Sequence, residues 1–67
     1  MRWWQYLKEV GEARRAHSQW REGQAYFNVL ETHLPHLANK VRGTDLDPFY
    51  RDDRIDAFRE WLSLQLE

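Results

Sequence analysis

His17, His33 and His36 are the only imidazoles in the chain and the first candidates for metal chemistry. His33 and His36 are three residues apart, a spacing that can bring two nitrogen ligands to one zinc ion. Pro35 lies between them and interrupts a regular helical face, and the chain has no cysteine and no adjacent carboxylate pair to complete four ligands. We therefore expect no metal site and no cofactor. His17 is expected to be a partly buried core histidine, and the other two to be ordinary residues at helix ends.

Aspartates gather in one stretch of the chain and suggest a calcium site or a carboxylate pair: Asp45, Asp47, Asp52, Asp53 and Asp56. A calcium loop that began at Asp45 would place Tyr50 where glycine is needed and Asp56 where glutamate is needed. That pattern excludes a typical calcium loop. Carboxylates at the start of a helix accept bonds from free N–H groups and face the positive end of its dipole. We therefore expect Asp52 or Asp53 to cap the last helix rather than to form a catalytic pair.

Nucleophilic catalysis also lacks the residues that it needs. The chain has no cysteine, and Ser18 and Ser63 do not lie in the glycine-flanked turn that presents an attacking hydroxyl. The glycines at positions 11, 23 and 43 are too scattered to form a phosphate-binding loop. The sequence therefore predicts that the protein is not an enzyme.

Charge is divided along the chain although the net charge is only -1. Residues 1–43 contain seven Lys and Arg against four Glu, a balance of +3, and residues 44–67 contain three Arg against seven acidic residues, a balance of -4. We expect the acidic half to lie across the basic half. A nucleic-acid-binding module is the less favoured alternative, because the chain has no basic excess. Its phosphate contacts would be Lys8, Arg14, Arg15, Arg21, Lys40 and Arg42.

Apolar residues three and four positions apart predict helices over about residues 2–17, 19–33 and 53–66. Ser18 is the expected N-cap of the second helix, and Gly23 on its apolar stripe is expected to allow a close approach. Pro35 begins a short helix over residues 35–42, which Gly43 ends in the left-handed conformation. The sequence therefore predicts three longer helices and a short one.

Residues 44–53 contain turn-forming residues without sustained periodicity, which indicates an ordered loop around Asp-Pro-Phe-Tyr. Leu46, Phe49 and Tyr50 are expected to fold this loop onto the core. The fold class is therefore all-α, a small helical bundle forming a single domain over residues 1–67. No apolar run is long enough for a membrane span, and the first residues lack the apolar stretch of a secretory signal. We expect a cytoplasmic protein with no membrane partner.

Trp3 and Trp4 are the strongest candidates for a binding surface. Four Trp, three Tyr and three Phe are more than a small helical core readily hides, so some must lie near the surface. Adjacent residues point about 100° apart on a helix, so these two cannot both face the core. An exposed Trp beside Arg2 and Lys8 would anchor a protein partner or a second copy of the chain. The alternative is a Trp that closes the end of the bundle.

Three runs of residues form a further pattern: Arg21-x-Gly23-Gln24-Ala25-x-Phe27-Asn28-x-Leu30, Pro35-x-Leu37-Ala38-x-x-Val41-Arg42-Gly43-Thr44 and Asp47-Pro48-Phe49-Tyr50-x-Asp52-x-Arg54-Ile55. This pattern, over about residues 21–61, resembles a group of small uncharacterised bacteriophage and prophage proteins. The resemblance implies a protein that acts in the cytoplasm of a bacterial host by binding host or phage proteins, and it carries over no catalytic residue. Residues 1–20 lie outside the pattern and are the candidate partner-specific part.

The sequence thus predicts a small phage-type accessory protein that binds a host or phage protein, with a homo-oligomer as a further alternative. The candidate contacts are Trp3, Trp4 and Arg15 in the first helix, and Arg42, Asp45, Asp47, Phe49, Tyr50 and Arg51 in and beside the loop. The alternative is that Arg42 and the loop aspartates form an internal network of ion pairs and caps that fixes this corner of the fold.

Overall fold

Four α-helices and one 3-10 turn form the chain in the computed structural model, which describes residues 1–66. In order, they are α1 (Trp3–Ala16), α2 (Glu22–His33), α3 (Pro35–Val41), the 3-10 turn η1 (Asp52–Arg54) and α4 (Ile55–Gln65). No strand occurs among these residues, so the expected all-α bundle is confirmed. Within the same range, no helix combines the length and the apolar character that a membrane span requires.

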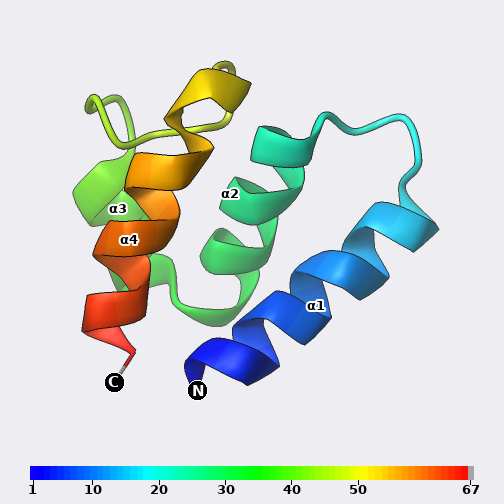
Figure 1. The fold of residues 1–67 in the computed structure, drawn as a ribbon, viewed down its shortest axis with the longest axis horizontal. Coiled ribbons are helices and arrows are strands. Elements are labelled where there is room, and N and C mark those ends of the chain that lie inside the picture. Colours follow the sequence, from blue (N-terminus) through cyan, green and yellow to red (C-terminus); the bar gives the residue numbers. More distant parts are fainter. Residues whose placement is uncertain (67) are drawn as a thin grey trace.

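α2 is the central helix of the bundle. α1 lies along one side of it, and α3 and α4 lie on the other (Figure 1). Half of its residues are buried, namely Gly23, Ala25, Tyr26, Phe27, Val29 and Leu30. These positions cover more than one stripe, because neighbouring helices pack on the helix from more than one side. The buried surface of α2 is therefore wider than the single apolar stripe that the periodicity predicts for this segment.

α1 is attached to α2 through Tyr6, which is fully buried. Its hydroxyl donates a hydrogen bond of 2.6 Å to the backbone carbonyl oxygen of Tyr26. Burial raises the pKa of the Tyr6 phenol far above its ordinary value of 10.0, and the nearby Tyr26 adds a smaller effect in the same direction. Aromatic contacts continue from Tyr26 to Phe58 in α4, so one row of rings connects three helices.

α2 begins at Glu22 rather than at residue 19, and Ser18 is not its cap. The segment before it turns back, because the Trp20 N–H donates to the His17 carbonyl oxygen at 3.0 Å. The two side-chain rings also stack, with 3.8 Å between their centroids and 9° between their planes. His17 is therefore an exposed residue at the end of α1, and its expected place in the core is wrong.

Side chains from two places satisfy the first N–H groups of α2. Gln24 Oε1 accepts a hydrogen bond from the Arg21 N–H at 3.4 Å, and Asp52 Oδ1 accepts one from the Gly23 N–H at 3.0 Å. The carboxylate of Asp52 therefore caps α2 from a distant turn. Neither Asp52 nor Asp53 caps α4 as expected, because that helix continues directly from η1.

Gly23 allows the loop to touch the beginning of α2. A Cβ atom at this position would lie 2.2 Å from the carbonyl oxygen of Pro48 and 2.8 Å from Asp52 Oδ1. No side chain fits at such distances, so the expected close approach is confirmed. The group that approaches Gly23 is the backbone of the loop, at the Pro48 carbonyl.

The limits of α3, the short helix after α2, agree with the prediction from the sequence. Pro35 occupies the first position of α3, and Gly43 beyond its end has a φ of 76°, in the left-handed region. Leu37, Ala38 and Val41 are buried on the inner side of the short helix, against α2. Helices α1, α3 and α4 begin and end within about two residues of the predicted limits.

Candidate functional site

An apolar surface, here called the terminal patch, lies where the two ends of the chain meet (Figure 1). Its residues are Met1, Trp3, Trp4 and Leu66, which line two shallow hollows that share Trp4. The Trp4 side chain is 61% exposed, and Met1 is 43% exposed. The two cations that the sequence places beside an exposed Trp, Arg2 and Lys8, also line these hollows, as do the polar residues Gln5 and Glu9.

Trp3 has a different role from its neighbour. Its ring stacks on Tyr6 with 5.6 Å between centroids and packs against the core. The guanidinium of Arg59 in α4 lies 5.8 Å from the Trp3 ring centroid and adds a cation–π contact. Trp3 therefore closes the end of the bundle, and Trp4 is the one that faces solvent. Of the two alternatives, the Trp that closes the bundle is therefore found at position 3, and the exposure that a binding Trp would need is found at position 4.

Arg15 lies apart from Trp3 and Trp4. It lies near the opposite end of α1, where it lines a hollow with Gly11, Arg14, Ser18 and Trp20. The loop candidates lie at a third place, since the segment after α3 is far from both chain ends (Figure 1). The candidate contacts therefore belong to three separate surfaces rather than to one site.

Asp47 is a structural residue of the loop. Its Oδ2 accepts a hydrogen bond of 2.8 Å from the Gly43 N–H, and its Oδ1 accepts one of 2.9 Å from the Phe49 N–H. One carboxylate thus connects the end of α3 to the far side of the loop. The Arg21 guanidinium also donates a hydrogen bond to the carbonyl oxygen of Phe49. These contacts confirm that the loop is ordered, and Asp47 acts as the capping residue of the internal network.

Arg42 and Arg51 both have carboxylate partners, but neither pairs with Asp45 or Asp47. Arg42 Nη2 lies 2.7 Å from Glu31 Oε2, and its guanidinium also lies 5.1 Å from the Phe27 ring centroid. Arg51 pairs with Asp53 at 2.7 Å, and this hydrogen bond lowers the pKa of the Asp53 carboxyl below its ordinary value of 3.8. Both ion pairs are on the surface, where each contributes little to stability.

Phe49 and Tyr50 line one hollow together with Arg42 and Asp47, but the two aromatic residues differ in burial. The Phe49 ring packs edge-on against Phe27 at 5.8 Å and is partly buried, as is Leu46. Tyr50 is 79% exposed, so its expected position on the core is wrong. The planes of the adjacent Phe49 and Tyr50 rings are 70° apart. Of the two rings, only that of Phe49 packs against the core.

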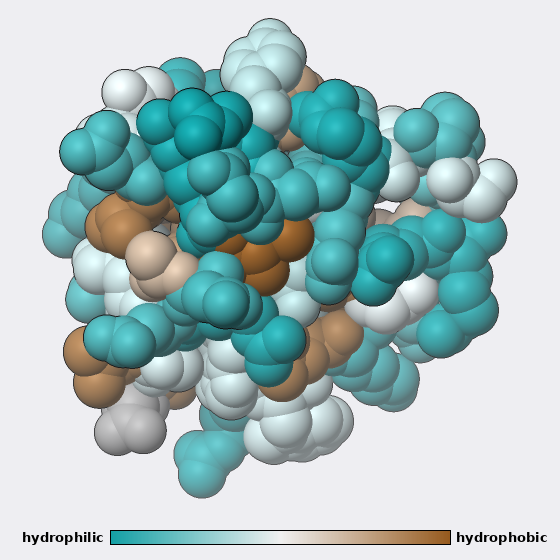
Figure 2. All heavy atoms as spheres, turned by 45° about the horizontal axis from the view of Figure 1, so that its top comes forward, coloured by the Kyte–Doolittle hydropathy of each residue, from teal (hydrophilic) through white to brown (hydrophobic). Residues whose placement is uncertain are grey.

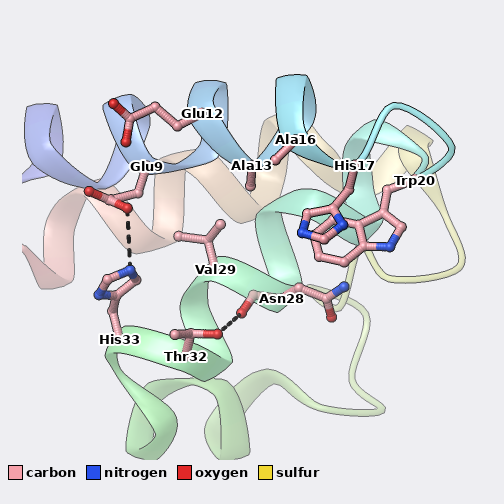
Figure 3. Close-up of a pocket in the computed structure, with 10 residues that line it drawn as sticks. All are labelled: Glu9, Glu12, Ala13, Ala16, His17, Trp20, Asn28, Val29, Thr32 and His33. Carbon is pink, nitrogen blue, oxygen red and sulfur yellow. Dashed lines mark hydrogen bonds and ion pairs between the residues drawn. The ribbon is translucent and has the colours of Figure 1, made fainter.

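A groove of about 310 Å³ between α1 and α2 was not anticipated from the sequence. Small apolar side chains of Ala13, Ala16 and Val29 line its middle (Figure 3). Glu9 and Glu12 lie toward one end, and the stacked rings of residues 17 and 20 lie at the other (Figure 3). The helical spacing of positions 9, 13 and 16 was the available signal, but it does not reveal how far apart two helices lie.

His33 and His17 lie at opposite ends of the groove between α1 and α2 (Figure 3). His33 Nε2 lies 3.6 Å from Glu9 Oε1, across the groove between α2 and α1, and His17 stacks on Trp20. Within residues 1–66, no group of three or more His, Cys, Asp and Glu side chains is placed to hold a metal ion.

Ion pairs are found mostly within each half of the chain. Arg14–Glu22 and Arg42–Glu31 lie in the basic half, Arg51–Asp53 in the acidic half, and Arg21–Asp52, at 3.9 Å, joins the two among residues 1–66. Within residues 1–66, Arg21–Asp52 is therefore the one ion pair between the acidic half and the basic half. Apolar packing also connects the two halves, as do hydrogen bonds between side chains and backbone such as that from the Gly23 N–H to Asp52.

The face of the molecule shown in Figure 2 is largely hydrophilic, and hydrophobic residues appear on it only in small separate areas. Comparisons of the chain with protein-family models, with curated proteins and with solved structures found no match. The candidate surfaces must therefore be interpreted from their own chemistry.

Proposed function

We propose that this chain is a small accessory protein of the phage type that binds another protein and catalyses no reaction. The observation that carries the proposal is the exposed ring of Trp4 within the terminal patch. The resemblance to small bacteriophage proteins supports a host or phage protein as the partner, in the bacterial cytoplasm. Residues 1–20, which lie outside that resemblance, contain most of this patch.

Trp4 has the properties of a binding anchor. Tryptophan is enriched among residues that dominate binding energy, because a large rigid ring buries much surface at a small cost in side-chain entropy. Its neighbours Met1 and Leu66 extend the apolar area, and the polar rim contains two cations, Arg2 and Lys8, against one carboxylate, Glu9. A partner with an apolar pocket and an acidic rim fits this surface.

Nucleic-acid binding receives less support than binding of a protein. Of the candidate phosphate contacts, Arg14, Arg21 and Arg42 already pair with carboxylates. Phosphate binding would have to break these pairs, and the adjacent acids would repel the backbone. A protein partner is therefore favoured.

Affinity capture from bacterial lysate tests the proposal, with tagged wild-type chain, Trp4→Ala and Leu64→Ala compared before and after nuclease treatment. Leu64 is the matched control, because it is an exposed apolar residue of α4 outside the terminal patch. We expect one protein to be enriched by the wild type and by Leu64→Ala, and to be lost with Trp4→Ala. Recovery that disappears with nuclease, or that Trp4→Ala leaves unchanged, would contradict the proposal.

The stability of Trp4→Ala distinguishes a lost contact from a lost fold. Trp4 is mostly exposed, so truncation should change the free energy of unfolding by no more than about 0.5 kcal/mol and Tm by no more than about 4 °C. A larger loss of Tm would place the ring among the structural residues. A sizing run of the wild type completes the test, since a concentration-dependent dimer that Trp4→Ala abolishes would assign the patch to self-association.

A further inference from the structure

The groove between α1 and α2 exists because small residues meet there. Ala13 and Ala16 of α1 face Val29 of α2, and none of them is long enough to fill the space between the helices. The result is an apolar strip bordered by polar groups, open to solvent along its outer side. A small molecule would remain half in water at such a place, whereas a helix lying along the strip would cover it.

The charged side chains that line the groove are carboxylates. Glu9 and Glu12 line it, and no Lys or Arg is among the residues that do. Glu9 is within 3.6 Å of the His33 imidazole, while Glu12 forms no ion pair within residues 1–66. The basic neighbour Arg14 pairs with Glu22 instead and so does not compensate these carboxylates. A ligand that carries positive charge is therefore attracted to this end, and a phosphate is repelled.

The two ends of the groove have different chemistry. Carboxylates occupy one end, and the stacked rings of His17 and Trp20 form a flat wall at the other (Figure 3). Glu9 and His17 are eight positions apart on α1, which corresponds to about 12 Å along a helix. About two turns of a partner helix span this distance, so one apolar side chain can lie over the alanines while a cation lies one turn away at the carboxylates.

We propose that this groove, here called the α1–α2 groove, binds a basic amphipathic helix of a partner protein. A lysine or arginine of that helix pairs with Glu12 and Glu9, and an apolar side chain packs on Ala13, Ala16 and Val29. The charge complementarity and the length of the apolar strip carry the assignment. Glu9 also lines a hollow of the terminal patch, but none of Met1, Trp3, Trp4 and Leu66 lines the α1–α2 groove, so this proposal does not depend on the function proposed above.

The test uses the full ¹⁵N-labelled chain and a synthetic peptide of about 15 residues, the length at which an isolated helix begins to be stable. The peptide places Leu at every third or fourth position and Lys on the flanking positions, and a scrambled peptide has the same composition and charge. Amide shifts at residues 13, 16, 28 and 29 report binding in the α1–α2 groove. We expect shifts there with the amphipathic peptide, and at least about fivefold weaker binding of the scrambled one.

Two variants test the separate contributions of charge and shape. Glu12→Lys should weaken binding by roughly three- to tenfold, because an exposed attractive pair becomes a repulsive one. Ala16→Leu places a larger side chain in the apolar strip and should weaken peptide binding by a similar factor. Glu60→Lys is the matched control on the exposed face of α4 and should change the affinity by less than about twofold.

Three results would overturn the proposal. The first is the absence of shifts at these amides with millimolar peptide. The second is a loss of affinity in Glu60→Lys as large as in Glu12→Lys, which would mean attraction by net charge alone. The third is movement of the same amides on dilution of the chain without peptide, which would make a second copy the occupant.

Discussion

Gly23 illustrates how one missing side chain determines where the loop lies. The carbonyl oxygen of Pro48 occupies the space that a Cβ atom would take, and the Gly23 N–H is bonded to Asp52. The loop, η1 and the beginning of α2 therefore meet at Gly23, and a shift of any one of them would require the other two to move. Gly11, by contrast, lies in the middle of α1, and a Cβ atom there would meet only Arg15 Nη1, at 3.8 Å.

Alanine substitutions at these two glycines should change the free energy of unfolding in opposite directions. Gly23→Ala should lower the free energy of unfolding by about 2–4 kcal/mol, because the loop backbone must move away from α2. Gly11→Ala should raise it by up to about 1 kcal/mol, because alanine favours an open helical position. Urea unfolding of both variants measures the difference. A Gly23→Ala protein as stable as the wild type would mean that the loop is not held against this residue.

α2 connects the other elements of the bundle, because α1, α3 and η1 pack against it and its Tyr26 ring contacts Phe58 of α4. Tyr6 connects α1 to it by a buried hydrogen bond, and Val10 adds apolar contact one turn further along. α1 has only these two buried residues. The hydroxyl of Tyr6 therefore has a large share in holding the first helix in place.

Tyr6→Phe tests this connection through its pH dependence. The variant should lose about 1 kcal/mol of stability at pH 7, because the packing remains and only the hydrogen bond is lost. Burial raises the pKa of the Tyr6 phenol, so the unfolded chain releases this proton near pH 10 while the folded chain retains it. Wild-type stability should therefore fall as the pH rises above about 10.

The fall in stability between pH 9 and about 11 should be shallower in Tyr6→Phe, because the substituted ring has no proton to release. Thermal unfolding of both proteins across this range measures the difference between the two slopes. Equal slopes would show that the Tyr6 hydroxyl ionises as readily in the folded chain as in the unfolded one.

The molecule as a whole has the size of a single compact unit. Its radius of gyration of 10.7 Å agrees with about 11 Å for a folded domain of this length. One core contains residues of all four helices, and a domain of this size commonly gains only about 3–5 kcal/mol of net stability. No single helix therefore has enough buried surface to remain folded after the others leave.

Unfolding should accordingly be a single cooperative transition. The four tryptophans report on α1, on the segment before α2 and on α4, and circular dichroism at 222 nm reports on all helices. We expect the fluorescence and circular dichroism curves in urea to coincide. Fluorescence that changes at lower urea than circular dichroism would show that α1 separates before the rest unfolds.

Local features of this fold could be predicted wherever neighbouring residues decide them. Pro35 and Gly43 limit α3 through their own backbone geometry, and the spacing of Ile55, Phe58 and Leu62 defines the buried side of α4. The failures concern contacts between distant segments. Asp52 was expected to cap the helix that follows it, but its carboxylate bonds to Gly23, 29 positions away. Gln24, a cap inside its own helix, was overlooked in favour of Ser18.

The sequence alone determined that the chain is a helical bundle with an ordered loop, because periodicity, proline and glycine act over a few residues. It also determined that one of two adjacent tryptophans must face outward. Only the tertiary structure decided that this one is Trp4, and that Glu9 and Glu12 border an apolar groove. Exposure and groove width depend on how closely separate helices pack, and that distance is set by all of their contacting side chains together.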